Sequence, residues 1–285
     1  MCLFQNFLFL KSRKGIRTGE SNCLQVHLLL NLCSQKGQKM LDIIGIYNEY
    51  LKTIEDERKE EYKASNREKF FRASMAGSCF KKHLYYLNDA ESKEMGRKSR
   101  RLLRLGTIIH KDFEDALVTH SLNNDVSIMS EYQVEMPELQ VKGTLDVAYM
   151  NPDINTIEIF DLKSSKAWTW SKKFGYKKNR DKNPSTNYEL QLGTYALALK
   201  KANSDWEFAL YIVYYKKDDS SIKLIKISNT WIDEAEMYWE ELLEATEKGK
   251  LAPDDLIAGS APNTPVYEWE CKYCQFSPIC DTPFR

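Results

Sequence analysis

Hydrophobic residues recur along this chain with two different periods. A helical period of three to four positions runs through residues 41–63, 78–88, 105–117, 188–201 and 231–248. Runs rich in β-branched and aromatic residues, which predict strands, cover residues 128–136, 141–150, 156–163, 208–215 and 222–227. The pattern predicts an α/β fold in which three consecutive strands form a meander, followed by a helix, two strands and a last helix.

Turn and cap residues sharpen some of these boundaries. Pro137 and the Asn151-Pro152-Asp153 run separate the three strands of the meander. Ser78 is the expected N-cap of the second helix, and Asn88 its expected end. Residues 164–185 carry no clear period, and we expect them to form a polar loop.

The composition is that of a globular protein with a full core. Of the 285 residues, 42% are hydrophobic and 29% are charged. No apolar run reaches the roughly 18 residues that span a bilayer, which excludes an integral membrane protein, and we expect no membrane partner. Lys+Arg and Asp+Glu both number 41, so a nucleic-acid surface would require local clustering of basic residues.

The first 39 residues differ from the rest in pattern and charge. They hold six basic residues and one acidic residue, and the patterned helix begins only after Lys39. We expect residues 1–39 to be a non-native leader, with Met40 as the natural start; the alternative is a genuine N-terminal arm. The apolar residues 1–10 precede the basic Lys11, the reverse of a secretory signal, so we expect a cytoplasmic protein of a bacterium, an archaeon or a phage.

The most informative chemistry lies on two strands of the meander. Asp146 stands on one strand, and Asp161 and Lys163 stand on the next. Side chains alternate along a strand, so Asp161 and Lys163 share a face about 7 Å apart. Two carboxylates can hold a hard divalent cation, Mn²⁺ or Mg²⁺, and a neighbouring lysine can orient water for phosphodiester hydrolysis. Asp161-x-Lys163 alone is a weak signal, because such a pair is more often an exposed ion pair.

Side chains on two helices add to this set. His110 lies on the helix before the meander, and an imidazole beside two carboxylates favours metals such as manganese. Gln191 and Tyr195 are four residues apart on the helix after the meander, so they share one face. Taken singly, each of the three is also consistent with an ordinary core or surface residue.

The ordered combination resembles the RecB-like branch of the PD-(D/E)XK nucleases. The resemblance rests on Gly106-x-x-x-His110, Gly143-x-x-Asp146, Asp161-x-Lys163 and Gln191-x-x-x-Tyr195, and it covers residues 106–215. It implies that His110, Asp146, Asp161 and the Leu162 carbonyl hold the metal. It further implies that Lys163 serves the attacking water, while Gln191 and Tyr195 position the lysine and the phosphate backbone. Many relatives carry Glu where Asp161 stands, and either carboxylate can ligate.

Four cysteines form a second candidate site. Cys271, Cys274 and Cys280 lie within ten residues of one another, and Cys79 lies 192 residues before them. Four thiolates suit zinc or an iron-sulfur cluster, and spacing does not decide between them. A single early cysteine with a C-terminal triplet resembles the AddB nuclease domain and CRISPR-associated RecB-like nucleases, which implies a structural [4Fe-4S] cluster. Zinc, free thiols and disulfides are the alternatives.

Basic residues cluster in two places. Residues 164–185 interleave aromatic and basic side chains, a composition typical of a track for single-stranded nucleic acid. The DNA-binding candidates there are Lys166, Trp168, Trp170, Lys172, Lys173, Tyr176, Lys177, Lys178 and Arg180. The alternative is a solvated loop whose tryptophans pack on the core. Arg100, Arg101 and Arg104 form a second candidate patch that faces solvent or phosphate.

Together these features predict a restriction-endonuclease-like α/β core: a central mixed β-sheet flanked by helices, with an N-terminal helical cap and a cluster-bound C-terminal tail. We divide the chain into a leader (1–39), a helical segment with the first cysteine (40–95), the nuclease core (96–250) and the cysteine-rich tail (251–285). The expected activity is metal-dependent DNA hydrolysis, with a preference for single strands and exonuclease action implied by the family.

Two rivals and several partners stay open. A catalytically silent DNA-binding scaffold would keep the fold, and a zinc-stabilised module would bind RNA or a protein partner. The expected roles are recombination, repair, phage replication or CRISPR adaptation. A helicase, integrase or recombination partner, or a homo-oligomer, would be compatible with them. The chain has no Walker-type phosphate loop, so an unwinding motor would have to be another subunit.

Overall fold

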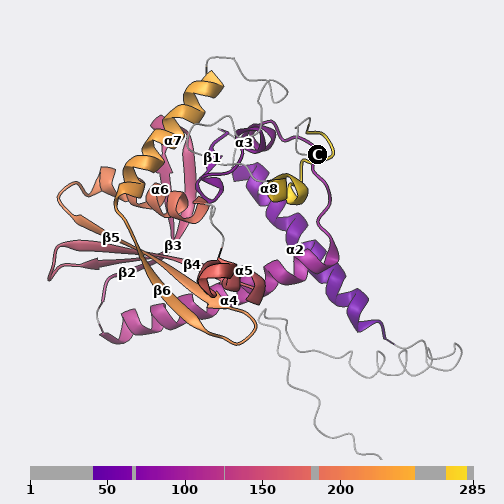
Figure 1. Ribbon diagram of the computed structural model, residues 1–285, viewed down its shortest axis with the longest axis horizontal. Helices are drawn as coiled ribbons and strands as arrows, with labels where there is room; N and C mark the ends of the chain where they lie inside the picture. The colour runs from indigo at the N-terminus through magenta and orange to yellow at the C-terminus, as the bar shows by residue number, and fades with distance from the viewer. Residues whose placement is uncertain (1–40, 66–68, 125, 181–185, 248–267, 281–285) are drawn as a thin grey trace, which may run out of the picture. The chain divides into compact units, whose positions relative to one another are not determined.

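The computed structural model describes residues 41–65, 69–124, 126–180, 186–247 and 268–280 (Figure 1). The chain divides into two compact units, Met1–Ile46 and Tyr47–Arg285. Of the first unit, only residues 41–46 are described, so the architecture below is that of the second unit. The predicted leader, its boundary at Met40 and residues 251–267 of the predicted tail lie outside the described residues.

The order of helices and strands follows the predicted pattern closely. The described helices, including short 3-10 turns (η), are α2 (Ile43–Ser65), η1 (Ala73–Met75), α3 (Phe80–Leu87), α4 (Arg97–Asn124), η2 (Pro137–Leu139), α5 (Ala167–Phe174), η3 (Lys177–Asn179), α6 (Asn187–Ala202), α7 (Thr230–Glu247) and α8 (Glu268–Tyr273). The described strands are β1 (Phe71–Arg72), β2 (Ile128–Met136), β3 (Val141–Asn151), β4 (Thr156–Ser165), β5 (Glu207–Lys216) and β6 (Ile222–Ile227). Among the described residues, none of the helices is both long and apolar enough to cross a bilayer.

The described strands form one mixed sheet with the order β1-β3-β4-β5-β6, and β2 pairs with β3 as well. The predicted meander is confirmed, because β2, β3 and β4 pair antiparallel in sequence. β4 and β5 run parallel, and α6 is the crossover helix between them. β5 and β6 form an antiparallel hairpin. The architecture is therefore a central mixed sheet flanked by helices, the restriction-endonuclease-like fold.

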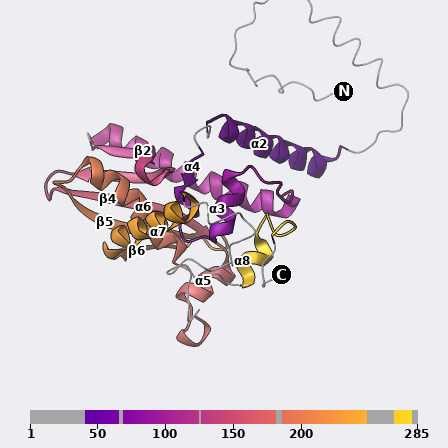
Figure 2. The same ribbon diagram turned by 90° about the horizontal axis from the view of Figure 1, so that it is seen from above.

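Helices cover both faces of the sheet (Figures 1 and 2). α6 and α7 pack over one face, where Tyr214 of β5 lies against Tyr188 of α6 with ring centroids 6.4 Å apart. α4 covers the opposite face, where the neighbouring Tyr215 meets Phe113 of α4 edge to face at 6.2 Å. The alternation of side chains along β5 thus joins the two helical layers to one sheet.

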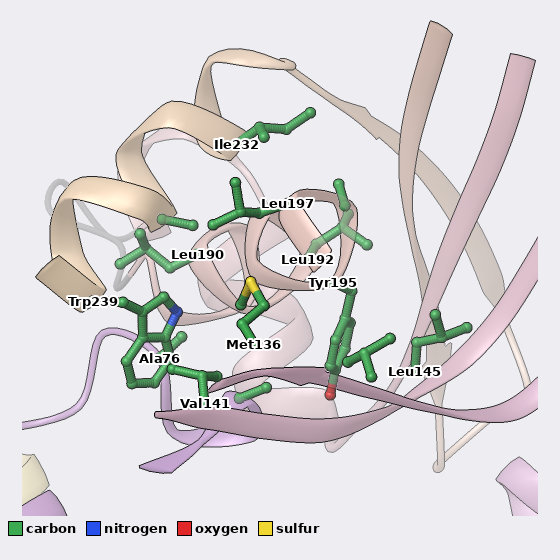
Figure 3. Packing of buried hydrophobic residues seen from close by; sticks show 14 of the residues in the cluster. Ala76, Met136, Val141, Leu145, Leu190, Leu192, Tyr195, Leu197, Ile232 and Trp239 are labelled. Atoms are coloured by element: carbon green, nitrogen blue, oxygen red, sulfur yellow. The ribbon is translucent and has the colours of Figure 1, made fainter. Parts of the chain in front are cut away.

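The core lies between the sheet and the α6–α7 pair (Figure 3). Trp239 of α7 is fully buried, and its indole N–H donates to the buried Thr194 hydroxyl of α6 at 2.8 Å. The two helices approach closely at Gly193, where a Cβ would stand 2.0 Å from the Trp231 carbonyl oxygen. Removal of this apolar surface from water stabilises the face of the fold on which Gln191 and Tyr195 lie.

Three local predictions were wrong. α3 begins at Phe80, with Cys79 rather than Ser78 in the N-cap position and no side-chain cap bond. The helix predicted over residues 105–117 is longer at both ends, because α4 runs from Arg97 to Asn124 and includes the basic residues. Residues 167–174 form helix α5 rather than loop, followed by η3, while residues 181–185 lie outside the described residues.

Candidate active site

The candidate site forms where two strands of the meander separate. The β3–β4 ladder runs from Asn151↔Thr156 to Val147↔Phe160 and then stops. Asp146 and Asp161 would be the next pair, so the two carboxylates stand at the fork. Instead of a backbone bond across the gap, Asp146 Oδ2 accepts a hydrogen bond from the Leu162 N–H at 2.7 Å. The first carboxylate is therefore fixed to the strand that carries the second.

Asp161 and Lys163 form a close ion pair inside the protein. Lys163 Nζ lies 3.0 Å from Asp161 Oδ1 and 2.8 Å from Oδ2, which confirms that the two side chains share a face. The Asp161 residue is only 1% exposed, and its Oδ2 has no partner in hydrogen-bond geometry among the described residues. A buried carboxylate oxygen in this state is suited to a cation.

Burial dominates the electrostatics of this pair. It raises the pKa of Asp161 to about 6, because the Lys163 charge offsets only part of the loss of solvent and the Asp146 charge adds to it. Burial also raises the pKa of Asp146. Burial works in the other direction on Lys163, but the charges of Asp161 and Asp146 outweigh it and raise the pKa of the ammonium. Lys163 therefore stays charged, whereas its single positive charge does not fully offset the loss of solvent around the two carboxylates.

Helix α6 holds the lysine from the other side. Lys163 Nζ donates to Gln191 Oε1 at 3.0 Å, and Gln191 Nε2 donates to the Tyr195 hydroxyl at 2.8 Å. Figure 3 shows the Tyr195 side chain extending from α6 toward the sheet. Gly143 makes room for it, since a Cβ there would stand 3.2 Å from Tyr195 Cε1 and 2.6 Å from Ala73 Cβ. The predicted shared face of Gln191 and Tyr195 is confirmed.

His110 approaches the carboxylates from α4. Its Nδ1 lies 3.9 Å from Asp146 Oδ2, a close approach but longer than a hydrogen bond. Burial, followed by the charge of Lys163, lowers the pKa of His110. The imidazole is therefore neutral near pH 7, which is the form that binds metals.

Two acidic residues near this site escaped the sequence analysis. Glu131 of β2 lies between Ser130 and Tyr132, which pair with Val147 and Leu145 on either side of Asp146, and its backbone has the uncommon φ of +50°. Loss of solvent, together with a hydrogen bond to Glu114 and the charge of Glu114, raises its pKa to about 7. Glu114 could have been found, because it lies four residues after His110 on the same helix face. Glu131 requires knowledge of the strand register.

The donors present fit a hard divalent cation in kind. Asp146, Asp161 and His110 supply two carboxylates and an imidazole, and the buried Asp161 Oδ2 has the Lys163 ammonium beside it but forms no hydrogen bond of good geometry. The described residues contain no group of three or more His, Cys, Asp or Glu side chains already gathered at metal-binding distance. Lys163 Nζ already lies 3.0 and 2.8 Å from the two Asp161 oxygens, so the carboxylate would have to be shared between lysine and metal.

The basic segment after β4 divides into buried and exposed parts. Trp170 and Phe174 of α5 pack against the core, with ring centroids 4.8 Å apart. Trp168 and Tyr176 are 72% and 81% exposed. Lys173 pairs with Glu189 at 3.3 Å and Arg180 donates to the Gly175 carbonyl, whereas Lys166, Lys172, Lys177 and Lys178 are exposed. One of the two tryptophans therefore packs on the core, as the second alternative expects, and the nucleic-acid track stays a prediction.

The second basic patch is used largely within the protein. Arg100 is 9% exposed and forms ion pairs with Glu55 and Glu94. Arg101 donates to the Asn48 side chain at 2.7 Å. Arg100 and Arg101 are therefore not used in the proposed DNA surface, and Arg104 is the one remaining candidate of the three.

The C-terminal cysteines lie beside α3. Phe276 is buried against the rings of Tyr85 and Tyr86, with centroids 5.2 and 5.0 Å apart, and the Lys93 N–H donates to the Gln275 carbonyl at 2.8 Å. Cys274 and Cys280 belong to this cluster. Burial raises the pKa of the Cys79 thiol, and the charges of Cys280 and Cys271 raise it further. Cys79 is therefore close enough to Cys271 and Cys280 for their charges to act on it, and no disulfide joins the described cysteines.

Buried polar contacts fix the helix that begins at Cys79. His83 of α3 and the Tyr238 hydroxyl of α7 are 2.8 Å apart, and that hydroxyl donates to the Ser78 carbonyl at 3.1 Å. Burial lowers the pKa of His83 to about 3, so the imidazole is neutral. α3 and Cys79 are thereby tied to the core through α7.

No curated protein sequence matches the chain. Among solved structures it is similar to SSO0001 (19% identity, covering 82% of this chain and 96% of that one, TM-score 0.49). It is also similar to a protein assigned as an exonuclease from Eubacterium rectale (17%, 68% and 87%, 0.45) and to an alkaline exonuclease from Laribacter hongkongensis (15%, 67% and 93%, 0.38).

The family comparison covers nearly the whole chain. The model of the PD-(D/E)XK nuclease superfamily matches residues 24–281. This span contains the strand fork, the helices that supply His110 and Gln191, and all four described cysteines. The chain belongs to the PD-(D/E)XK nuclease superfamily.

Proposed function

We propose that this nuclease is a metal-dependent deoxyribonuclease of the RecB-like iron-sulfur type that acts on single-stranded DNA ends. The observation that carries the metal-dependent part is the position of Lys163, which is held between Asp161 and Gln191 at a fork with the buried Asp161 and the half-buried Asp146. A lysine fixed in this way has no structural need for a second carboxylate, Asp146, beside it. Two carboxylates and one lysine do fit the hydrolysis of an anionic phosphodiester.

In this proposal Asp146, Asp161, His110 and the Leu162 carbonyl hold Mn²⁺ or Mg²⁺. The metal, when bound, lowers the pKa of water and compensates charge on the phosphate. Lys163 orients the attacking water from its position beside Asp161, and Gln191 fixes the ammonium. Tyr195 holds the Gln191 amide in turn, so that Gln191 presents its oxygen to the lysine.

Exposed groups on the α5 segment support a single-strand track. Trp168 and Tyr176 offer ring faces to unstacked bases, and Lys166, Lys172, Lys177 and Lys178 offer charge to phosphates. Trp170 and Lys173 have a structural role instead, because Trp170 packs against the core and Lys173 forms an ion pair with Glu189. The segment leaves directly from β4, so a strand bound along it would lead to the fork.

The four cysteines would hold a [4Fe-4S] cluster that fastens the C-terminal segment to α3. The burial of Phe276 and Cys280 against Tyr85 brings the two ends of the fold together, which is where a structural crosslink has most effect. Zinc at the same thiols is the alternative. We also propose the division of the chain into a helical segment up to residue 95, a nuclease core over residues 96–250 and a cysteine-rich tail from residue 251.

One experiment tests the finer activity. Single-stranded and double-stranded DNA, labelled in turn at the 5′ and 3′ ends, would be digested by anaerobically purified protein with Mn²⁺ or Mg²⁺. A ladder that shortens from one end, on single strands first, would support a single-strand exonuclease and give its polarity. Internal cuts, or equal rates on duplex DNA, would contradict that assignment, and only the broader assignment as a nuclease would remain.

A further inference from the structure

A lysine outside the predicted site residues lies at the mouth of the fork. Lys217 is in the turn between β5 and β6, and its backbone N–H donates to the Ser165 carbonyl at 2.9 Å. The next residue, Asp218, accepts a hydrogen bond from the Ala167 N–H at 2.6 Å. The turn thus fastens to the chain just after Lys163, where β4 leads into α5.

The side chain of Lys217 reaches across to α4 at a glycine. Its Nζ donates to the Leu102 carbonyl at 3.2 Å. A Cβ on Gly106 would stand 3.7 Å from Lys217 Nζ and 3.1 Å from Ser164 Oγ. The absence of a side chain at Gly106, one turn before His110, therefore leaves space for the Ser164 hydroxyl, and the Lys217 ammonium lies within contact range of the same position.

Lys217 has no counter-charge among the described residues. The acidic residues of its own turn are used elsewhere: Asp218 caps α5, and Asp219 pairs with Lys216 at 2.6 Å. Burial lowers the pKa of Lys217, and the charge of Lys166 lowers it further. The charge of Lys217 in turn lowers the pKa of His110, so Lys217 interacts electrostatically with the candidate site. Two lysines thus stand together without a carboxylate, and an anion would relieve their repulsion.

We propose that Lys217, together with Lys166 and the Ser164 hydroxyl, binds a phosphate of the DNA strand at the mouth of the active site. The proposal rests on the proposed nuclease function and adds a substrate contact from the β5–β6 turn. The alternative is a purely structural lysine that ties this turn to α4 through Leu102. The two differ in salt dependence, because only a phosphate contact releases a counterion from DNA.

The test compares Lys217→Met and Lys217→Arg with the wild type and with Lys226→Met. Lys226 is exposed on β6 opposite Tyr211, so it controls for the loss of one charge. DNA cleavage would be measured against substrate concentration, and binding of a labelled single strand would be measured in EDTA over a range of salt concentrations. We expect Lys217→Met to raise KM about tenfold with little change in kcat. We expect its slope of log K against log salt to lose about 0.7.

Lys217→Arg and Lys226→Met should behave as the wild type. Gly106→Ala should also raise KM without lowering Tm, because alanine favours the helix while its Cβ would crowd the Ser164 hydroxyl at 3.1 Å. If the wild type cleaves and Lys217→Met matches it in KM and salt slope, the inference is overturned and the nuclease function stands. If even the wild type fails to cleave, the proposed function falls, and the salt slopes alone decide the role of Lys217: a lost contact supports it and equal slopes overturn it.

Discussion

The carboxylate of Asp146 accepts a hydrogen bond from the backbone N–H of Leu162 at 2.7 Å. This bond replaces strand pairing beyond Val147↔Phe160 and joins β3 to the strand that carries Asp161 and Lys163. Two carboxylates that are 15 positions apart in the sequence therefore open onto the same space. The arrangement gives each residue at the fork a distinct expected effect.

Lys163→Ala should reduce DNA cleavage by a factor of about 10²–10⁴ or more, because the attacking water loses the group that orients it. The variant should still bind Mn²⁺, which would be measured by calorimetry, and should still fold. Its Tm without metal should fall, since Asp161 would be left buried without its cation.

Lys200→Ala, an exposed substitution near the end of α6, serves as the matched control and should cleave normally. Retention of full activity by Lys163→Ala would remove the lysine from the chemistry.

Asp161 should titrate near pH 6 in the metal-free protein, because burial raises its pKa to about 6 from an ordinary value of 3.8. The folded state then holds this proton more tightly than the unfolded chain does. The contribution of Asp161 to the free energy of unfolding should therefore fall as the pH rises from about 4 to about 6. Carboxyl ¹³C NMR, assigned with Asp161→Asn, measures the titration directly.

Addition of Mg²⁺ should shift that titration to lower pH, because a bound cation favours the charged carboxylate. A midpoint near 4 without metal, or a midpoint that Mg²⁺ leaves unchanged, would contradict the account of this site.

The sequence predicted the strands and the shared faces because the evidence for them is local. The alternation in β4 is sufficient to place Asp161 beside Lys163, and a spacing of four is sufficient to place Gln191 beside Tyr195. α5 was mistaken for a loop because its apolar face is short, consisting of Trp170 and Phe174, and lies among lysines in the sequence. That face is buried by contacts with the β5–β6 hairpin, which the local pattern does not show. The burial of Arg100 depends on Glu55 of α2, 45 residues earlier, which no local pattern indicates.

The fork itself also lay beyond the sequence. The point at which β3–β4 pairing ends, and the approach of Glu131 to Asp146, depend on how β3 is aligned with its two neighbours, β2 and β4. Lys217 was missed because it belongs to no motif and reaches the site only through the closure of a turn. These contacts are set by tertiary structure, whereas the motifs mark only the residues that the family shares.

Trp168→Ala should weaken binding of single-stranded DNA by about 1–3 kcal/mol, the usual contribution of one base stacked on an aromatic ring. Trp168 is 72% exposed, so its removal should leave Tm unchanged. Fluorescence anisotropy with a labelled oligonucleotide measures the effect. Leu122→Ala, which removes an equally exposed apolar side chain from the end of α4, should bind as the wild type, and a Trp168 variant that does the same would remove the α5 track.

Cys274→Ser should abolish the brown colour and visible absorption expected of the anaerobically purified protein and should lower its Tm. The cluster would otherwise join α3 to the segment that carries Phe276, so its loss frees that segment. Cys33→Ser, a substitution outside the four-cysteine set, should change neither property. A colourless wild type that contains zinc would correct the identity of the metal, and an unchanged Tm in Cys274→Ser would argue against a structural crosslink.

The most direct test of the central claim is cleavage of labelled DNA by the anaerobically purified wild type and by Asp161→Asn, with Mn²⁺, with Mg²⁺ and with EDTA. The account predicts cleavage only by the wild type and only with a divalent metal, while the variant still binds the DNA. Cleavage by Asp161→Asn at the wild-type rate, or wild-type cleavage in EDTA, would contradict it.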